Sequence, residues 1–231
     1  MSNTAAKLSL GTERYPLIDH LRTLAILAMI FYHATYDLVL FQLVRVNLRS
    51  FAWEMVPNTI VATFLFCVGA SLGISHFPQP KWTSYLRRLS KIAVGALIVS
   101  IITRILFPTQ WVYFGTLHVI TLATLLAIPF LKYPKTAFVT GLSVILLPSI
   151  TGISVPWIKL THSSIDYIPP VPWFGFTLLG IAAFHAGAHR LRVPALKVSE
   201  WISRHSLKIY LLHQVILFGL TWVIAKLSRL I

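Results

Sequence analysis

The chain has 231 residues, of which 56% are hydrophobic and only 11% are charged, and its mean hydropathy is +0.76. A soluble domain of this size would be about a quarter charged, so an ordinary soluble domain is excluded. There are 20 Lys and Arg against 6 Asp and Glu. The basic residues lie between apolar runs. This distribution favours contact with anionic lipid over binding to nucleic acid. The single cysteine, Cys67, excludes an intrachain disulfide and any C-x-x-C metal or redox motif.

Seven apolar runs follow a polar N-terminal segment. Residues 1–16 show no features of a removable signal peptide and are predicted to be a cytoplasmic tail. A bilayer span needs roughly 20 apolar residues. Residues 17–231 are therefore predicted to form one all-α, multi-pass helical bundle without internal repeats. The expected helices cover residues 17–40, 57–75, 89–107, 111–131, 137–155, 172–188 and 202–224, and prolines between several of them remove backbone donors.

The basic residues predict the orientation of these helices. Alternating loops divide them into a larger group on one side and a smaller group on the other. The larger group is Lys7, Arg14, Arg22, Lys81, Arg87, Arg88, Lys91, Lys132, Lys135, Arg190, Arg192, Lys197, Arg204 and Lys208. The smaller group is Arg45, Arg49, Arg104, Lys159, Lys226 and Arg229. The positive-inside rule then places the N-terminus in the cytoplasm and the C-terminus outside, in a cell (inner) membrane.

Four ionisable residues in the first predicted helix need an explanation, because such groups are costly inside a bilayer. Asp19, Arg22, His33 and Asp37 are spaced so that all four fall on one helix face. Arg22 and His33 are separated by about 16 Å along the axis, at 1.5 Å per residue. The sequence therefore predicts a polar stripe that a single extended ligand could contact at both ends.

The stripe contains two pairs with helical spacing. His33 and Asp37 can hydrogen-bond, which would orient the imidazole as a general base or nucleophile. Asp19 and Arg22 can pair while part of the guanidinium fork stays free for phosphate. The alternative, given equal weight to the functional interpretation, is that the four residues form two structural ion pairs that hold helices together.

Other candidates lie on later helices. His118 begins the fourth helix at a depth comparable to His33, so the two histidines could line one outer cavity, or His118 could simply donate to a carbonyl. Arg87 and Arg88, with Lys81 and Lys91, could hold a nucleotide phosphate or anionic lipid heads. A small-residue face at Gly69, Ala70, Ser71 and Gly73 favours close helix packing and otherwise leaves room for a ligand.

The remaining candidate residues lie on the last predicted helix and in the loop before the sixth predicted helix. His213 is either a wall residue of a ligand cavity or a buried interhelical donor. The outer loop carries Trp157, His162 and Asp166, followed by Trp173. Aromatic faces and a carboxylate suit a sugar, although an interfacial belt predicts the same tryptophans.

Familiar soluble-enzyme motifs are missing from the sequence. It contains neither a G-x-G-x-x-G after a strand nor a G-x-x-x-x-G-K phosphate loop. His33 and Asp37 supply only two metal ligands on one helix, so no metal is predicted.

Several runs resemble bacterial membrane proteins related to the catalytic domain of heparan-alpha-glucosaminide N-acetyltransferase. They are YPLIDHLRTLAILAM (15–29), HATYDL (33–38), FLFCVGASL (64–72), FGTLHVI (114–120), PWFGF (172–176) and HSLKIYLLHQ (205–214). The spacing of Arg22 and His33 is also similar to a motif of the wider membrane acyltransferase superfamily. Leu117-His118-Val119 departs from the eukaryotic relatives, which tend to have arginine there, and the chain lacks their lumenal domain, so heparan specificity is not carried over.

The resemblance implies a helical bundle that takes acetyl-CoA from the cytoplasm and acetylates an amino or hydroxyl group of an extracytoplasmic glycan. His33 would be the general base or acyl carrier, Asp37 its orienting residue and His118 the second choice for catalysis. Asp19 and Arg22 would anchor the cofactor, helped by Arg87, Arg88 and His213. The lipid bilayer and a glycan are the expected partners, and a homo-oligomer is compatible with this interpretation. The alternatives are a transporter or flippase, or a non-catalytic membrane protein, using the same stripe.

Overall fold

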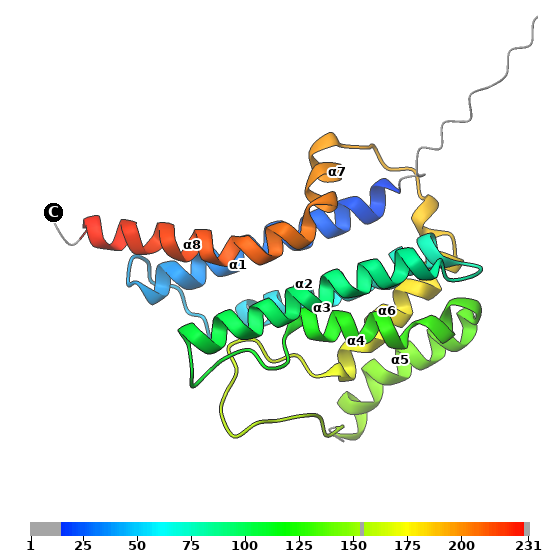
Figure 1. Cartoon of the computed structure of the whole chain (residues 1–231), viewed down its shortest axis with the longest axis horizontal. Coiled ribbons are helices and arrows are strands. Elements are labelled where there is room, and N and C mark those ends of the chain that lie inside the picture. Colours follow the sequence, from blue (N-terminus) through cyan, green and yellow to red (C-terminus); the bar gives the residue numbers. More distant parts are fainter. Residues whose placement is uncertain (1–14, 153–154, 229–231) are drawn as a thin grey trace, which may run out of the picture.

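The structure is a computed structural model that describes residues 15–152 and 155–228, and these residues form an all-α bundle without strands (Figure 1). The predicted N-terminal tail, with Lys7 and Arg14, lies almost entirely outside the described residues, as does Arg229. The helices are α1 (Pro16–Leu40), α2 (Phe51–His76), α3 (Trp82–Leu106), α4 (Thr116–Leu126), α5 (Pro134–Thr151), α6 (Pro170–His185), α7 (Lys197–Arg204) and α8 (Ser206–Ser228), with short 3₁₀ helices η1 (Ile128–Lys132) and η2 (Ala188–Arg190).

Five of these helices are long and apolar enough to cross a membrane: α1, α2, α3, α5 and α8. Each of the seven predicted apolar runs contains a helix, but α4 and α6 are shorter than a usual span. For α4 the reason is local. The chain stays irregular from Phe107 to Gly115, and after Leu126 it tightens into η1, where Pro129 lies in the first turn.

Several predicted boundaries were wrong because hydropathy alone does not mark helix ends. Helix α3 begins at Trp82 rather than at residue 89, because Arg87, Arg88 and Lys91 are good helix formers that lower the hydropathy without breaking the helix. Helix α2 begins at Phe51, where Ser50 caps it, and continues through Pro57. The run predicted at residues 202–224 is divided at His205 into α7 and α8.

The long helices alternate in direction, so their ends gather at two ends of the bundle (Figure 1). We call one of them the basic end. It holds the start of α1, α3, α5 and α8, the end of α2 and α6, and α7, and it lies to the right in Figure 1. The described residues of the larger basic group lie at or near this end. Helix α8 runs beside α1, while α5 packs on α6 and α6 packs on α2.

Glycines allow the closest helix contacts. A methyl group at Gly69 of α2 would collide with the Thr177 carbonyl oxygen of α6, and one at Gly180 of α6 would collide with the Phe66 carbonyl oxygen of α2. A methyl at Gly73 would overlap the Phe184 ring. The small-residue face predicted on α2 is therefore a packing surface against α6, as small residues commonly are in membrane bundles.

Candidate functional site

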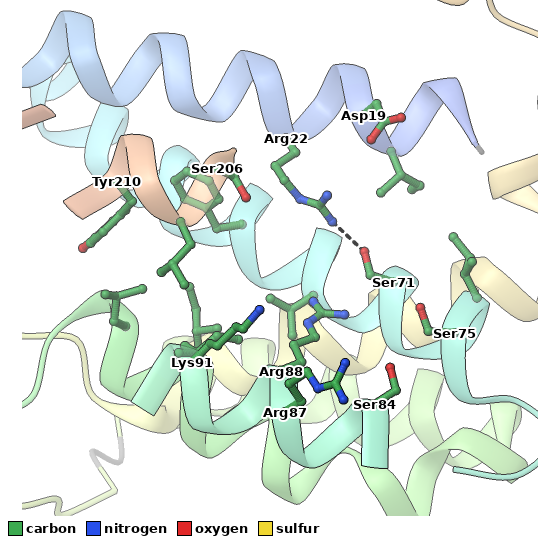
Figure 2. A pocket seen from close by; sticks show the side chains of 18 of the residues that line it. Asp19, Arg22, Ser71, Ser75, Ser84, Arg87, Arg88, Lys91, Ser206 and Tyr210 are labelled. Carbon is green, nitrogen blue, oxygen red and sulfur yellow. Dashed lines mark hydrogen bonds between the residues drawn. The ribbon is translucent and has the colours of Figure 1, made fainter. Parts of the chain in front are cut away.

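A cavity of about 870 Å³ opens at the basic end (Figure 2). It lies between the first turns of α1, α3 and α8 and the last turns of α2, with α4 at its inner end. Its charged lining residues are Asp19, Arg22, Lys81, Arg87, Arg88 and Lys91. Its hydroxyl-bearing lining residues are Tyr15, Ser71, Ser75, Ser84, Ser206 and Tyr210. Cations therefore outnumber the carboxylate, and the cavity is suited to a polyanion.

Helix α3 supplies most of the positive charge. Arg87, Arg88 and Lys91 are close in sequence near the start of the helix, so successive turns present their side chains to the same space. Arg87 and Lys91 are exposed, whereas Arg88 is half-buried. Figure 2 shows these side chains rising toward Arg22, which descends from α1 on the opposite wall. An anion held between the two helices would be contacted from both sides.

Arg22 is held by two serines from distant parts of the chain. Its guanidinium donates to the Ser71 hydroxyl of α2 at 2.6 Å and to the Ser203 hydroxyl of α7 at 2.8 Å. A guanidinium has five N–H donors, so further donors remain for a phosphate. Asp19 lies one turn earlier and lines the same cavity. The structure thus brings together Asp19, Arg22, Arg87 and Arg88, the group predicted for the cofactor, except for His213.

Helix α7 is fixed on α1 beside this cavity. The His20 ring lies 2.7 Å from both the Ser199 hydroxyl and the Pro194 carbonyl oxygen. Thr23 donates to the Ser199 carbonyl oxygen at 2.9 Å. Ser199 and Ser203 are buried on this face of α7. These contacts hold Ser203 where it can orient Arg22.

The inner end of the cavity is apolar. Phe64, Leu117, Ile120 and Leu207 line it together with the ring of Tyr210. The ring centroids of Tyr210 and Phe64 are 6.4 Å apart, and those of Tyr210 and His213 are 5.7 Å apart. A ligand with charged groups at the mouth and an uncharged arm directed inward matches this division.

His33 and His213 face each other where α1 packs on α8. Their ring centroids are 4.9 Å apart, with an interplanar angle of 64°. His213 Nδ1 lies 2.7 Å from the Tyr210 carbonyl oxygen, to which it donates, and its buried Nε2 has no hydrogen-bond partner. Neither histidine lines the basic cavity, but Tyr210 lies between the cavity and His213. Arg22 and His33 of the predicted stripe therefore each contact one of the C-terminal helices.

Asp37 has a different partner from the one expected. Its buried carboxylate accepts the Gln214 amide of α8, with Nε2 3.1 Å and 3.2 Å from the two oxygens. His33 instead contacts the rings of Tyr32 and His213. Because Gln214 follows His213 directly, Asp37 positions the α8 segment that carries the second histidine. Gln214 was not among the predicted site residues, since only the helix pairing reveals it.

His118 lies in a hydrogen-bond network at the start of α4. Its Nδ1 accepts the Gly115 backbone N–H at 3.1 Å, and its Nε2 is 3.1 Å from the Ser100 hydroxyl oxygen. Ser100 in turn donates to the Val112 carbonyl at 2.7 Å. A ring protonated on Nε2 satisfies all of these partners. Within the described residues no contact joins His118 to His33, and His118 connects the loop before α4 to α3.

The opposite end of the bundle carries a group of aromatic rings. Trp111 and His162 are stacked at 5.5 Å, Tyr113 meets the His162 ring edge-on at 5.3 Å, and Phe114 meets Trp157 at 5.2 Å. Trp173 of α6 instead packs against the main hydrophobic core of the bundle. The loop residues predicted to contact a sugar thus lie together with the loop before α4.

Asp166 fastens this outer loop to α4. Its carboxylate accepts the Thr116 backbone N–H at 2.8 Å and the Thr116 hydroxyl at 3.3 Å. Burial raises the pKa of Asp166, while the two hydrogen bonds from Thr116 oppose the rise. The carboxylate also lies at the positive end of the helix dipole. Asp166 is therefore a long-range cap for α4.

Two substitutions of Asp166 distinguish the contribution of its hydrogen bonds to stability from the contribution of its charge. Asp166→Ala removes the cap and is expected to lower the free energy of unfolding by about 0.5–2 kcal/mol. Asp166→Asn keeps an acceptor for the Thr116 N–H, so at neutral pH it should be at least as stable as the wild type. Since the folded-state pKa is raised, the wild type should become less stable relative to Asp166→Asn as pH rises above the ordinary carboxyl value. Thermal unfolding in detergent across this range tests the prediction, which fails if Asp166→Asn and Asp166→Ala are equally destabilised.

A metal centre finds no support in the geometry. Within residues 15–152 and 155–228, no group of three His, Cys, Asp or Glu side chains could hold a metal ion. Cys67 is a free, buried thiol.

The described residues form an α-helical bundle with five helices that are long and apolar enough to cross a membrane, and with a cavity rich in basic side chains at one end. Residues 14–215 match the family described as heparan-alpha-glucosaminide N-acetyltransferase, catalytic. The match covers most of the chain, so the protein belongs to this family, as its sequence motifs predicted, and membership indicates an acyltransferase. Comparisons with curated proteins and with solved structures gave no match.

Proposed function

We propose that the protein is a transmembrane acyltransferase that moves an acetyl group from acetyl-CoA at the basic end to an amino or hydroxyl group of a glycan at the other end. The observation that carries the proposal is the basic cavity with its apolar inner end, in a chain that belongs to this family. The proposed location is a cell (inner) membrane. The positive-inside rule then makes the basic end face the cytoplasm, which is the compartment that contains acetyl-CoA.

The donor fits the cavity by size and by charge. A volume of about 870 Å³ lies within the range of about 300–1,000 Å³ typical of ligand sites. The phosphates of acetyl-CoA would bind Arg22, Arg87 and Arg88, with Asp19 at the mouth of the cavity. The uncharged arm would extend inward along Phe64 and Leu117 toward Tyr210. Arginine forks suit this recognition because they contact phosphate through paired hydrogen bonds.

Acyl transfer needs a group that removes the proton of the acceptor. In the proposed reaction the acceptor N–H or O–H gives its proton to His33, its N or O forms a bond to the acyl carbon, and the carbon–sulfur bond breaks. The departing CoA sulfur then takes this proton from the His33 imidazolium, which leaves free CoA thiol and restores the base. His213 supports the His33 ring, and Asp37 acts as a positioning residue through Gln214. His118, whose two ring nitrogens are engaged at the start of α4, remains the second choice for catalysis.

Binding of acetyl-CoA to the detergent-purified protein tests the donor site. Isothermal titration calorimetry should detect binding to the wild type. Arg22→Ala should weaken it by about 10- to 100-fold, because hydrogen bonds to charged groups contribute about 1.5–3 kcal/mol. Since Arg22 also anchors α7, Arg87→Ala is a second variant whose exposed side chain is less involved in packing. Lys226→Ala, an exposed lysine near the far end of α8, is the matched control and should bind normally.

Two comparisons decide the outcome. Acetyl-pantetheine, which lacks the nucleotide phosphates, should bind much more weakly than acetyl-CoA if the arginines recognise those phosphates. If the wild type does not bind acetyl-CoA at millimolar concentration, or if Arg22→Ala and Arg87→Ala bind as well as Lys226→Ala, the cavity is not the donor site.

A further inference from the structure

A second cavity lies on the outside of the bundle, away from the basic cavity. It is a groove of about 390 Å³ between α8, the end of α7 and α1. Trp201 and His205 line one end, Leu212 and Ile216 line the long side, and His213 forms part of its floor. Leu212 and Ile216 are more than half exposed, as is typical of side chains that face lipid.

Helix α7 indicates where the membrane surface lies. Ser199 and Ser203 are buried against α1, whereas Leu196, Val198 and Trp201 are exposed by 59%, 70% and 58%. A short helix with charged residues and a large exposed apolar face lies in the interface between headgroups and acyl chains. The groove begins at Trp201, at the level of this helix, and therefore at the membrane surface of the basic end.

The charge and length of the groove match one lipid molecule. Lys208 is exposed at the end next to α7, beside His205. From Lys208 to Leu217 the groove follows ten residues of α8, and the nine steps between them cover about 14 Å at 1.5 Å per step. Half of a hydrocarbon core of about 30 Å is about 15 Å. The groove wall is thus apolar over a length that spans one leaflet, and the exposed ammonium group of Lys208 lies beyond this wall, at the end of the groove next to α7.

We propose that this groove binds one anionic phospholipid from the leaflet at the basic end. The phosphate contacts Lys208 and lies beside His205, and one acyl chain lies along Leu212 and Ile216 over the outer side of His213. The bound chain completes the packing of α8 on α1, where His213 meets His33. The inference does not depend on acyl transfer, because the groove is separate from the donor cavity.

Native mass spectrometry of the detergent-purified protein tests this site. Phosphatidylglycerol and phosphatidylcholine with identical chains are added at equal concentrations, and retention of each is measured. The wild type should retain phosphatidylglycerol preferentially. Lys208→Ala should reduce that retention about fivefold, since one basic residue near a membrane surface contributes about 1 kcal/mol toward anionic lipid. Lys226→Ala, at the far end of the same helix, is the matched control and should retain it normally.

A second variant tests the chain rather than the headgroup. Ile216→Trp fills the groove from a lipid-facing position and should reduce retention of phosphatidylglycerol while Lys208 is still present. Size-exclusion profiles of all variants confirm that they are folded. Equal retention of the two lipids by the wild type, or wild-type retention by either Lys208→Ala or Ile216→Trp, would overturn the proposal. Acetyl-CoA binding measured on the same samples reports on the donor cavity separately.

Discussion

His33→Asn is expected to abolish acetyl transfer while acetyl-CoA binding is retained. A positioned general base typically contributes 10²- to 10⁴-fold to rate, so loss of the imidazole should lower turnover by roughly that factor. Binding should persist because His33 does not line the basic cavity. Release of CoA thiol from acetyl-CoA, with glucosamine as a probe acceptor, measures turnover, and calorimetry measures binding.

The control for this experiment is another half-buried histidine. His185 of α6 contacts the Leu131 carbonyl oxygen at 2.7 Å and lies at the basic end away from the His33–His213 pair. His185→Asn should therefore retain turnover. Substituting His213 should lower turnover less than substituting His33, because His213 supports the ring rather than taking the proton. If His33→Asn turns over normally and His118→Asn does not, the base is His118 and the proposed role of His33 is wrong.

The basic cavity shows what one sequence can predict about a site. Arg22, Arg87 and Arg88 were identifiable because charges inside or beside apolar runs are costly and therefore informative. The distribution of Lys and Arg also predicts the side of the membrane on which they lie. Their convergence on one cavity also followed, since the first turns of α1 and α3 belong to the same end. The family motifs contain Arg22, whereas Arg87 and Arg88 were predicted only from the basic cluster beside an apolar run.

The partners of these residues could not be predicted in the same way. Ser71 and Ser203 orient Arg22 from positions 49 and 181 residues away. Gln214 similarly binds Asp37 across 177 residues. Serine and glutamine are common in helices, and only helix packing decides which of them face a buried charge. A single sequence carries the periodicity of each helix but not the pairing between helices.

Helix packing also explains why the side chains of His33 and His118 face different helices. The sequence predicted a comparable depth for the two histidines, but it did not predict the directions in which their side chains point. Rotation about the helix axis was not predictable, because α4 begins only at Thr116 and its first turn is fixed by Asp166 and Ser100. His118 therefore faces α3, whereas His33 faces α8.

Gly180→Val is expected to have the largest effect on folding. A methyl group at Gly180 would lie 2.9 Å from the Ala70 nitrogen and against the Phe66 carbonyl, so it meets backbone that no rotamer change can move. Gly69→Val acts on the same interface from the other helix, where a methyl would lie 2.8 Å from the Thr177 carbonyl carbon. Overpacking commonly costs about 1–3 kcal/mol, and backbone overlap places these variants at or above the upper value.

Thermal unfolding of the detergent-purified variants measures this effect, and Gly219→Val is the matched control. Gly219 lies in α8 with nothing within 4 Å of an added methyl, so its variant should unfold at or near the wild-type temperature. A variant that still folds but displaces α2 slightly should also show a change in acetyl-CoA binding. Ser71 lies two residues after Gly69 and holds Arg22, so a variant that folds with α2 displaced should bind acetyl-CoA more weakly. If Gly180→Val and Gly219→Val unfold at the same temperature, α2 and α6 are not in close contact. The position of Ser71, and hence of Arg22, would then not depend on that contact.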